Sequence, residues 1–257
     1  IFRPILTFSD RFPHPDRLKS CQLYGKLTTV HYVRIGRLMS GLAQKSAENG
    51  DLIDATGKRW VTMSNALTRA AHGLTLAEKR IIMMAVSTLN PKEVLRPGEV
   101  PTTRILAADY AAMAGIEAHT AYEQLQAAAK ALYERSVTFY VPAHRRGGKP
   151  LPPTRVQMRW VGEARYQQGE GWIEVCWWPK ILPHLTGLKK KFTSYQLQQA
   201  SALRSVYSWK MLELLMRFES TGWAEYTIED FKESMEAPQS LSDFAQIKRR
   251  IIEPAVA

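Results

Sequence analysis

Cysteine is scarce in this sequence of 257 residues, which contains only Cys21 and Cys176, far apart and in no CxxC pair. This scarcity argues against a zinc site or a disulfide framework and is typical of a reducing compartment. Long apolar runs are missing too, since no stretch reaches the roughly 18 consecutive apolar residues that indicate a membrane span. Because no basic segment followed by an apolar one opens the chain, we expect a cytoplasmic protein.

The motifs of several enzyme classes are also missing. The histidines form neither HxH nor HExxH, so the ligand set of a metal-dependent nickase is not supplied. The pair Gly57-Lys58 lacks the upstream glycine and the following hydroxyl of a P-loop, which argues against an ATPase or helicase. GxSxG and GxGxxG do not occur. We therefore expect a binding protein, not an enzyme, with no catalytic residue, no metal and no cofactor.

Basic residues are abundant: the formal net charge is +11 and the sequence pI is about 9.7. A polyanionic partner explains such an excess, with nucleic acid ahead of an anionic membrane surface. The alternative is a basic surface that serves solubility. The charge is uneven, because seven Lys or Arg against two Asp in residues 1–38 account for +5 of the total.

The segment 1–59 shows no sustained period. The chain opens on Ile1, prolines interrupt the first 15 residues, and Met39 is followed by a polar leader. We therefore expect translation to start at Met39 and residues 1–59 to be disordered or non-native. The alternative is a genuine basic arm.

The first structured unit is expected over residues 60–190. Ser64-Asn65 can cap a short helix, and Thr75 with Glu78 has the spacing of a capping box for a helix that ends before Pro91. A loop over 91–101 precedes a helix-turn-helix pattern. It comprises a helix at 107–114, a turn at Gly115-Ile116, and a helix capped by Thr120 and running to Leu132.

After this pattern the apolar period changes from 3.6 to 2, which predicts strands at 137–141, 155–160 and 172–177. The Gly-rich segment 142–153 between the first two carries Arg145 and Arg146. Helix-turn-helix, strand, basic hairpin and strand is the order of a winged helix.

A second cycle is expected over residues 191–257. Apolar spacing predicts a long helix over 192–217, an extended piece over 224–226, and a helix that opens on the capping box of Thr227 and Asp230. A last helix begins after Ser240 or Ser242. We expect an α+β fold with two winged-helix domains in tandem, the second truncated at its C-terminal end.

The last helix carries the sharpest candidate site. Gln246, Arg249 and Arg250 lie opposite its apolar stripe, and Arg and Gln pair bidentately with guanine and adenine in the major groove. Lys248 lies nearer the stripe and is expected to reach a phosphate. The alternative is an ordinary amphipathic helix with a solvated basic face.

Further basic residues are candidates for contacts to the DNA backbone. Lys189, Lys190 and Lys191, with Arg204, would place positive charge where the first helix of the second unit approaches DNA. Arg145 and Arg146 would follow phosphates as a wing does. The alternatives are a solvated linker and a charged hairpin tip. The strand spacing of Trp172, Trp177 and Trp178 predicts that they lie in the core or at an interface, and the alternative is a base-stacking platform.

The chain resembles the replication initiators of theta-replicating, iteron-regulated plasmids. The resemblance covers residues 60 to 257 and rests on these stretches, in the family's order: Ser64-Asn-Ala-Leu67, Leu74-Thr-Leu-Ala-Glu-Lys-Arg-Ile81, Tyr122-Glu-Gln-Leu125, Ala131-Leu-Tyr133, Arg159-Trp-Val161 through Tyr166, Phe192-Thr-Ser-Tyr-Gln-Leu197, Ser205-Val-Tyr207, Leu212-Glu-Leu-Leu215 and Ile247-Lys-Arg-Arg-Ile-Ile-Glu-Pro-Ala255.

The resemblance implies tandem winged helices whose monomers bind origin iterons, help to open the DNA, and bring in the host initiator and helicase. It also implies dimers, joined through the first domain, that bind an inverted repeat and repress the initiator's own gene. The family's base-reading helix corresponds to the segment around Lys248, Arg249 and Arg250. The alternatives are a winged-helix transcriptional regulator and a rolling-circle nickase using a tyrosine such as Tyr207.

Overall fold

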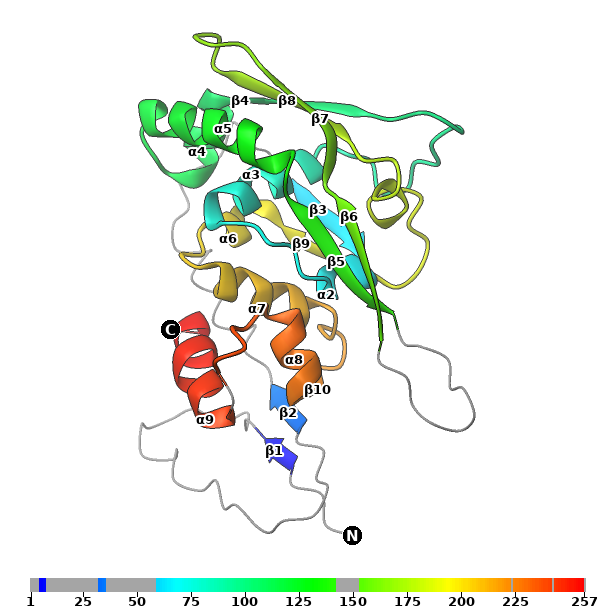
Figure 1. Ribbon diagram of the computed structural model, residues 1–257, viewed down its shortest axis with the longest axis vertical. Helices are drawn as coiled ribbons and strands as arrows, with labels where there is room; N and C mark the ends of the chain where they lie inside the picture. Colours follow the sequence, from blue (N-terminus) through cyan, green and yellow to red (C-terminus); the bar gives the residue numbers. More distant parts are fainter. Residues whose placement is uncertain are drawn as a thin grey trace.

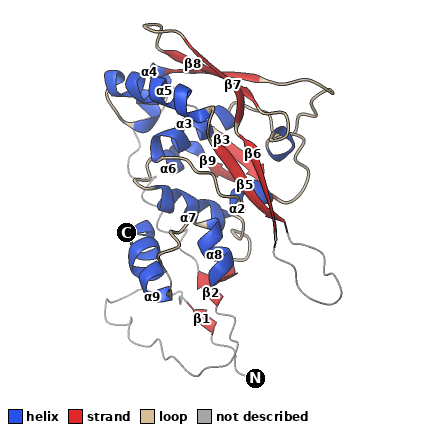
Figure 2. Cartoon of the chain, viewed as in Figure 1, coloured by secondary structure: helices blue, strands red, loops and turns tan. Residues whose placement is uncertain are grey.

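The computed structural model describes residues 59–141, 153–222, 224–241 and 243–256, together with the short stretches 5–7 and 32–35. The chain forms an elongated molecule, with the first helix-turn-helix at one end and the C-terminal helix near the other (Figure 1). In Figure 2 most of the helices lie along one side, and two long β-hairpins project from the other.

The first unit begins with helices whose caps follow the predicted motifs. Its elements, in order, are β3 (Trp60–Ser64), α2 (Asn65–Arg69), α3 (Leu76–Val86), β4 (Thr102–Leu106), α4 (Ala107–Ala114), α5 (Ala118–Leu132), β5 (Ser136–Val141), β6 (Thr154–Arg159), β7 (Val161–Tyr166) and β8 (Trp172–Trp177). Ser64 caps α2, and Thr75 and Glu78 form a complete capping box on α3. Both caps are confirmed.

The helix-turn-helix is confirmed in α4 and α5. Gly115, with a φ of 63°, ends α4 in the left-handed region that glycine adopts without steric cost. The N-cap of α5 is Glu117, which makes no side-chain capping bond, so the cap expected at Thr120 is wrong. The chain enters α5 three residues earlier than Thr120, and this residue lies inside the helix.

Antiparallel pairing organises the strands. The predicted strands at 137–141, 155–160 and 172–177 correspond to β5, β6 and β8. β5 pairs with β6 as a wing-like hairpin, and β8 lies between β4 and β7. The strands β3, β4 and β7 were not predicted; β3 and β4 have five residues each, and only their partners bring them into sheets.

The long helix expected over 192–217 is wrong. The segment forms β9 (Phe192–Gln196), α6 (Leu197–Ser201) and α7 (Val206–Met216) instead. β9 pairs with β3 from Trp60 opposite Gln196 to Ser64 opposite Phe192, so a partner more than a hundred residues away overrides the local helical spacing. β9 therefore pairs within the first unit, and the domain boundary expected between residues 190 and 191 stays a prediction.

The second unit starts with β10 (Ala224–Thr227) and α8 (Ile228–Ser234). The last helix is built from α9 (Phe244–Ile247), the π-helical turn η3 (Lys248–Ile252) and α10 (Glu253–Val256). Its N-cap is Asp243, whose carboxylate accepts from the Gln246 amide at 2.9 Å. The cap expected at Ser240 is therefore wrong, and Ser242 lies outside the described residues.

The N-terminal segment contributes two short strands, and the expectation that residues 1–59 are disordered or non-native stays a prediction. β2 (Tyr32–Ile35) pairs antiparallel with β10, and β1 (Ile5–Thr7) pairs parallel with β2. The start at Met39 stays a prediction. Among the described residues, no helix combines the length and apolar character needed to cross a membrane.

Two apolar cores meet at helix α7. Trp209 and Leu212 belong to the larger core under the first unit, whereas Met211, Leu214 and Leu215 belong to the core of the second unit. A helix buried on two faces gains apolar contacts from both sides. The helix α7 therefore joins the two units rigidly, and in Figure 1 it crosses the middle of the molecule between them.

Candidate nucleic-acid interface

The C-terminal helix presents a cationic face to solvent. Ile247, Ile251 and Ile252 are buried in the second core, while Gln246, Arg249 and Arg250 are exposed. Figure 1 shows this helix beside α7 and α8 at the lower end of the molecule.

The π-helical turn decides how the two arginines lie. At its end the Glu253 amide donates to the Lys248 carbonyl, five residues back. A π-turn advances less per residue than an α-helix, so neighbouring residues share a face. As a result Arg249 and Arg250 are both exposed, although a regular helical wheel places Arg250 less squarely outward.

Lys248 differs from its neighbours in being half-buried. Its ammonium lies 3.8 Å from the carboxylate of Glu253. Its stem therefore lies against the apolar side, while its charge is partly compensated within the helix.

The helix-turn-helix of the first unit has a different charge. Around the N-terminus of α5 the exposed side chains include Glu117, His119 and Glu123, and His119 lies 3.5 Å from Glu123. Carboxylates at this end of a helix repel phosphates. The second unit, not the first, thus offers the face suited to reading DNA.

The other predicted basic residues are not gathered at one place. Lys189, Lys190 and Lys191 are exposed in the turn that enters β9, where the Lys191 carbonyl accepts from the Asn65 amide at 2.8 Å. Arg204 is exposed between α6 and α7, beyond the other end of β9. The expectation that Arg204 and the three lysines approach the DNA backbone together stays a prediction.

Arg145 and Arg146 lie outside the described residues. In the hairpin that leads to them, β6 is exposed along most of its length, whereas β5 is exposed only at Tyr140 and Val141. Arg155 on β6 is exposed, and Arg159 lies 4.3 Å from the ring centroid of Tyr133. The described part of the hairpin thus contributes positive charge of its own.

A buried ionic network, not predicted from the sequence, joins α3, α7 and β9. Lys79 Nζ donates to the Glu213 carboxylate at 2.9 Å and to His72 Nδ1 at 2.7 Å. Tyr195 donates to the same carboxylate at 2.8 Å, and Trp209 Nε1 donates to the Tyr195 hydroxyl at 3.0 Å. Lys79 and Glu213 lie among the apolar residues of α3 and α7, and this pattern in the sequence could have predicted a buried ion pair.

Burial shifts the protonation equilibria of this network. It lowers the pKa of Lys79, while the charge and hydrogen bond of Glu213 oppose that shift. Burial, followed by the charges of Lys210 and Lys79, holds the pKa of His72 well below its usual value. Burial also raises the pKa of Tyr195 well above its usual value. The network is a charged pair beside a neutral histidine.

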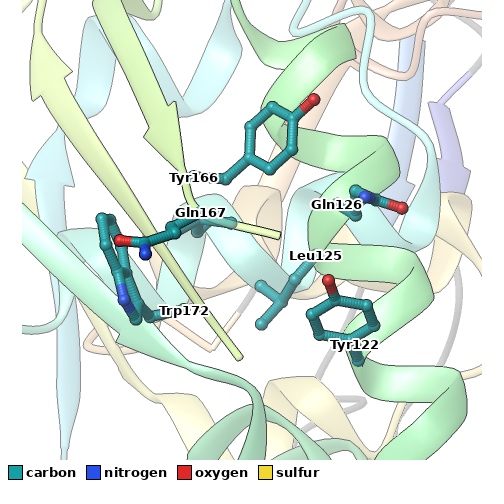
Figure 3. Close-up of a pocket in the computed structure, with 7 residues that line it drawn as sticks. Tyr122, Leu125, Gln126, Tyr166, Gln167 and Trp172 are labelled. Carbon is teal, nitrogen blue, oxygen red and sulfur yellow. The ribbon is translucent and has the colours of Figure 1, made fainter. Parts of the chain in front are cut away.

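A shallow hollow lies between α5 and the β7–β8 hairpin. Figure 3 shows Tyr122, Tyr166 and Trp172 around it, with Gln126 and Gln167 as polar neighbours. The Tyr122 hydroxyl accepts from the Gly169 amide at 2.8 Å, so it holds the turn between the two strands. This arrangement supports the hairpin. In the described part of the chain, no group of three or more His, Cys, Asp or Glu could hold a metal ion.

Two consecutive units, each with a helix-turn-helix arrangement, of which the second presents a cationic helix face in the described residues, are the arrangement of a tandem winged-helix protein. The family described as "Initiator Replication protein, WH1" matches residues 60–216, and "Initiator Rep protein, WH2" matches residues 227–257. The chain belongs to this family of initiator replication proteins. The first match ends with α7, which also contributes to the first core.

Similar proteins support the same assignment. An uncharacterized 27.6 kDa protein of Escherichia coli is 25% identical over 205 residues, covering 76% of this chain and 82% of its own length. The PI protein of Escherichia coli is 24% identical over 230 residues, covering 80% and 75%. A crystal structure of Pi initiator protein in complex with iteron DNA has the same fold, with a TM-score of 0.59, 22% identity and coverage of 78% and 85%.

Proposed function

We propose that this protein initiates plasmid replication by binding repeated origin sequences, the iterons, through its second winged helix. The observation that carries the proposal is the C-terminal helix, which is buried on one face and presents Gln246, Arg249 and Arg250 on the other. Membership of the initiator family and the fold shared with an initiator crystallised on iteron DNA support it.

In this proposal the helix enters the major groove. Arg249 pairs with guanine O6 and N7, Gln246 pairs with adenine N6 and N7, and Arg250 reads a further base or holds a phosphate. Lys248 contacts the backbone. Lys189, Lys190, Lys191, Arg204, Arg145 and Arg146 contribute contacts to phosphates.

The remaining steps follow from the same family resemblance. Bound monomers help to open the neighbouring DNA and bring in the host initiator and helicase. Dimers joined through the first domain bind an inverted repeat and repress the initiator's own gene. A winged-helix regulator without a replication role is the second candidate, and membership of the initiator family favours replication over it.

Arg249→Ala is expected to cost about 1–3 kcal/mol of binding to a specific duplex and to relax preference at one base position. The specific duplex is about two helical turns long and is selected from a pool of random duplexes by binding to the full chain. Lys190→Ala is expected to weaken specific and scrambled duplexes alike and to reduce the salt slope by about one unit. Titrations at several salt concentrations measure both effects.

Lys92→Ala is the matched control, because Lys92 is exposed in the loop between α3 and β4, away from the recognition helix. Equal losses on both duplexes for Arg249→Ala would make it a backbone contact. If Arg249→Ala lost no affinity for either duplex, the C-terminal helix would not contact the DNA and the proposal would be wrong.

The dimer proposal rests on exposed apolar side chains of the β5–β6 hairpin, of which Tyr140, Val141 and Val156 are 42%, 48% and 37% exposed. Val156→Lys is expected to shift the full chain toward the monomer in sedimentation velocity, because a buried ammonium at a subunit interface is costly. Val94→Lys is the control, since Val94 is 75% exposed in the loop between α3 and β4. An unchanged sedimentation profile for Val156→Lys would contradict this interface.

A further inference from the structure

We infer that Glu236, in the second unit, is a positioning residue that sets the angle between the recognition helix and the first unit, and thereby the geometry of the DNA site that both units contact. The inference rests on the proposed function. Its basis is a carboxylate of one unit held by the backbone of the other.

The contact is bidentate and joins distant parts of the chain. One oxygen of the Glu236 carboxylate accepts from the His72 amide at 2.8 Å, and the other accepts from the Gly73 amide at 2.8 Å. Lys210 Nζ lies 3.8 Å from the same carboxylate. Two successive backbone amides form an anion-binding concavity, and an ionised acceptor makes each bond stronger than a neutral one.

Further hydrogen bonds of His72 hold the two amides of the first unit in place. His72 donates from Nε2 to the Leu67 carbonyl at 2.8 Å and accepts at Nδ1 from Lys79 at 2.7 Å. Its carbonyl accepts from Trp160 Nε1 at 3.4 Å. The His72 amide therefore belongs to a residue that is buried in the first unit, whereas Gly73 is exposed.

Lys210 adds a positive charge beside the two amides that bind the Glu236 carboxylate. Its ammonium donates to the carbonyls of Ala70 and Thr68, and its side chain is 1% exposed. Burial lowers the pKa of Lys210 to about 8, so the ammonium still carries its charge at neutral pH. The Glu236 carboxylate meets a positive charge as well as two amides, because α7 brings Lys210 to the same place.

The backbone of Glu236 is strained for a residue with a side chain. Its φ is 54°, in the left-handed region, immediately after the C-cap of α8. The Ala237 amide donates to the Lys232 carbonyl at 2.9 Å and the Glu236 amide to the Glu233 carbonyl at 3.1 Å, which is a Schellman motif. Glycine is the usual residue at this position, so glutamate here is accounted for by its side-chain contact and not by the helix end.

The position of Glu236 in the chain links the first unit to the recognition helix. It stands between α8 and α9, so the chain leaves the first unit's surface at Glu236 and enters the recognition helix at Phe244. The helix α7, which contributes to both cores, and the ion pair of Arg69 and Asp230 at 3.6 Å also connect the units. The Glu236 contact adds a fixed point at the end of α8, from which the chain continues to the recognition helix.

The variant Glu236→Gly separates these roles, because glycine satisfies the Schellman motif and removes only the carboxylate. Glu233→Ala is the matched control, since Glu233 is an exposed carboxylate of the same helix. Spin labels on cysteines introduced at Glu99 and Gln239, with Cys21 and Cys176 changed to serine, report the distance between the units of the full chain. We expect a narrow distance distribution for the unmodified Glu236 and for Glu233→Ala, and a broad one for Glu236→Gly.

The DNA readout uses the enriched duplex and a shortened duplex of about one helical turn that only the second unit covers. Affinity of Glu236→Gly for the full duplex is expected to fall by about tenfold or more, since a loose link lowers the effective concentration of the first unit's contacts. Affinity for the shortened duplex should stay unchanged. Glu236→Gln, which retains the size of the side chain, should show the same pattern to a smaller extent.

A narrow distance distribution for Glu236→Gly, or an equal loss of affinity on both duplexes, would overturn the inference. The two proposals fail differently. If the chain selects no duplex but Glu236→Gly broadens the distance distribution, the contact between the units stands and iteron binding fails. If the chain binds its duplex and the distribution stays narrow, iteron binding stands and Glu236 has no positioning role.

Discussion

Glu213→Ala is expected to lower the free energy of unfolding by about 3–5 kcal/mol, because it leaves a buried charge without its partner. Glu213 is 0% exposed and accepts from Lys79 and from Tyr195, and Lys79 is 1% exposed. The ammonium of Lys79 would then keep the neutral ring of His72 as a hydrogen-bond partner, and the charge of Glu236 would still act on it, but its hydrogen bond to a carboxylate would be lost. Urea unfolding followed by circular dichroism measures the loss.

The matched control is Glu219→Ala, because Glu219 is exposed just beyond α7 and its removal is expected to change stability by less than about 0.5 kcal/mol. A double variant, Lys79→Met with Glu213→Leu, should recover much of the loss, since apolar residues of similar volume replace a buried ion pair at little cost. A loss below about 1 kcal/mol for Glu213→Ala would show that the pair is better hydrated than its burial indicates.

Trp209→Ala is expected to cost about 3–5 kcal/mol, the usual range for removing a large aromatic side chain from a core. Trp209 is 0% exposed, donates to the Tyr195 hydroxyl, and packs edge-on against the Tyr195 ring at a centroid distance of 6.5 Å. Because α7 also supplies the second core, the second unit should lose stability together with the first.

Calorimetry of the full chain tests this coupling: one shared transition should move to lower temperature. Trp178→Ala is the control, since Trp178 is 36% exposed on the surface of the first unit. Equal shifts for the two tryptophan variants, or a second unit that melts at its original temperature, would contradict the role given to α7.

Local chemistry was sufficient for the helix starts and for the recognition face. Ser64, Thr75 and Thr227 cap helices as their spacing predicts, because a cap bonds an amide only two or three residues away. Alternation predicted β5, β6 and β8 within about one residue. The exposed face with Arg249 was predicted from helical spacing alone, since burial of the isoleucines decides it.

Predictions failed where a distant partner decides the conformation. Residues 192–196 have helical spacing, yet they form a strand because β3 offers them an antiparallel partner and the core receives Tyr195. The turn that exposes Arg249 and Arg250 is π-helical, and Ile251 and Ile252 in the same turn are buried in the second core. Spacing on an isolated helix contains neither constraint.

The sequence by itself determined the family, the order of helix-turn-helix, strands and basic hairpin, and the Arg and Gln side chains that face solvent on the last helix. Only the tertiary structure decided that α7 belongs to both cores, that Lys79 and Glu213 pair in the interior, and that Glu236 meets the amides of the first unit. The physical reason is range. Caps and amphipathic faces depend on neighbours within one or two helical turns. A buried charge needs a partner within hydrogen-bonding distance, and for Lys79 that partner, Glu213, is 134 residues away in the sequence.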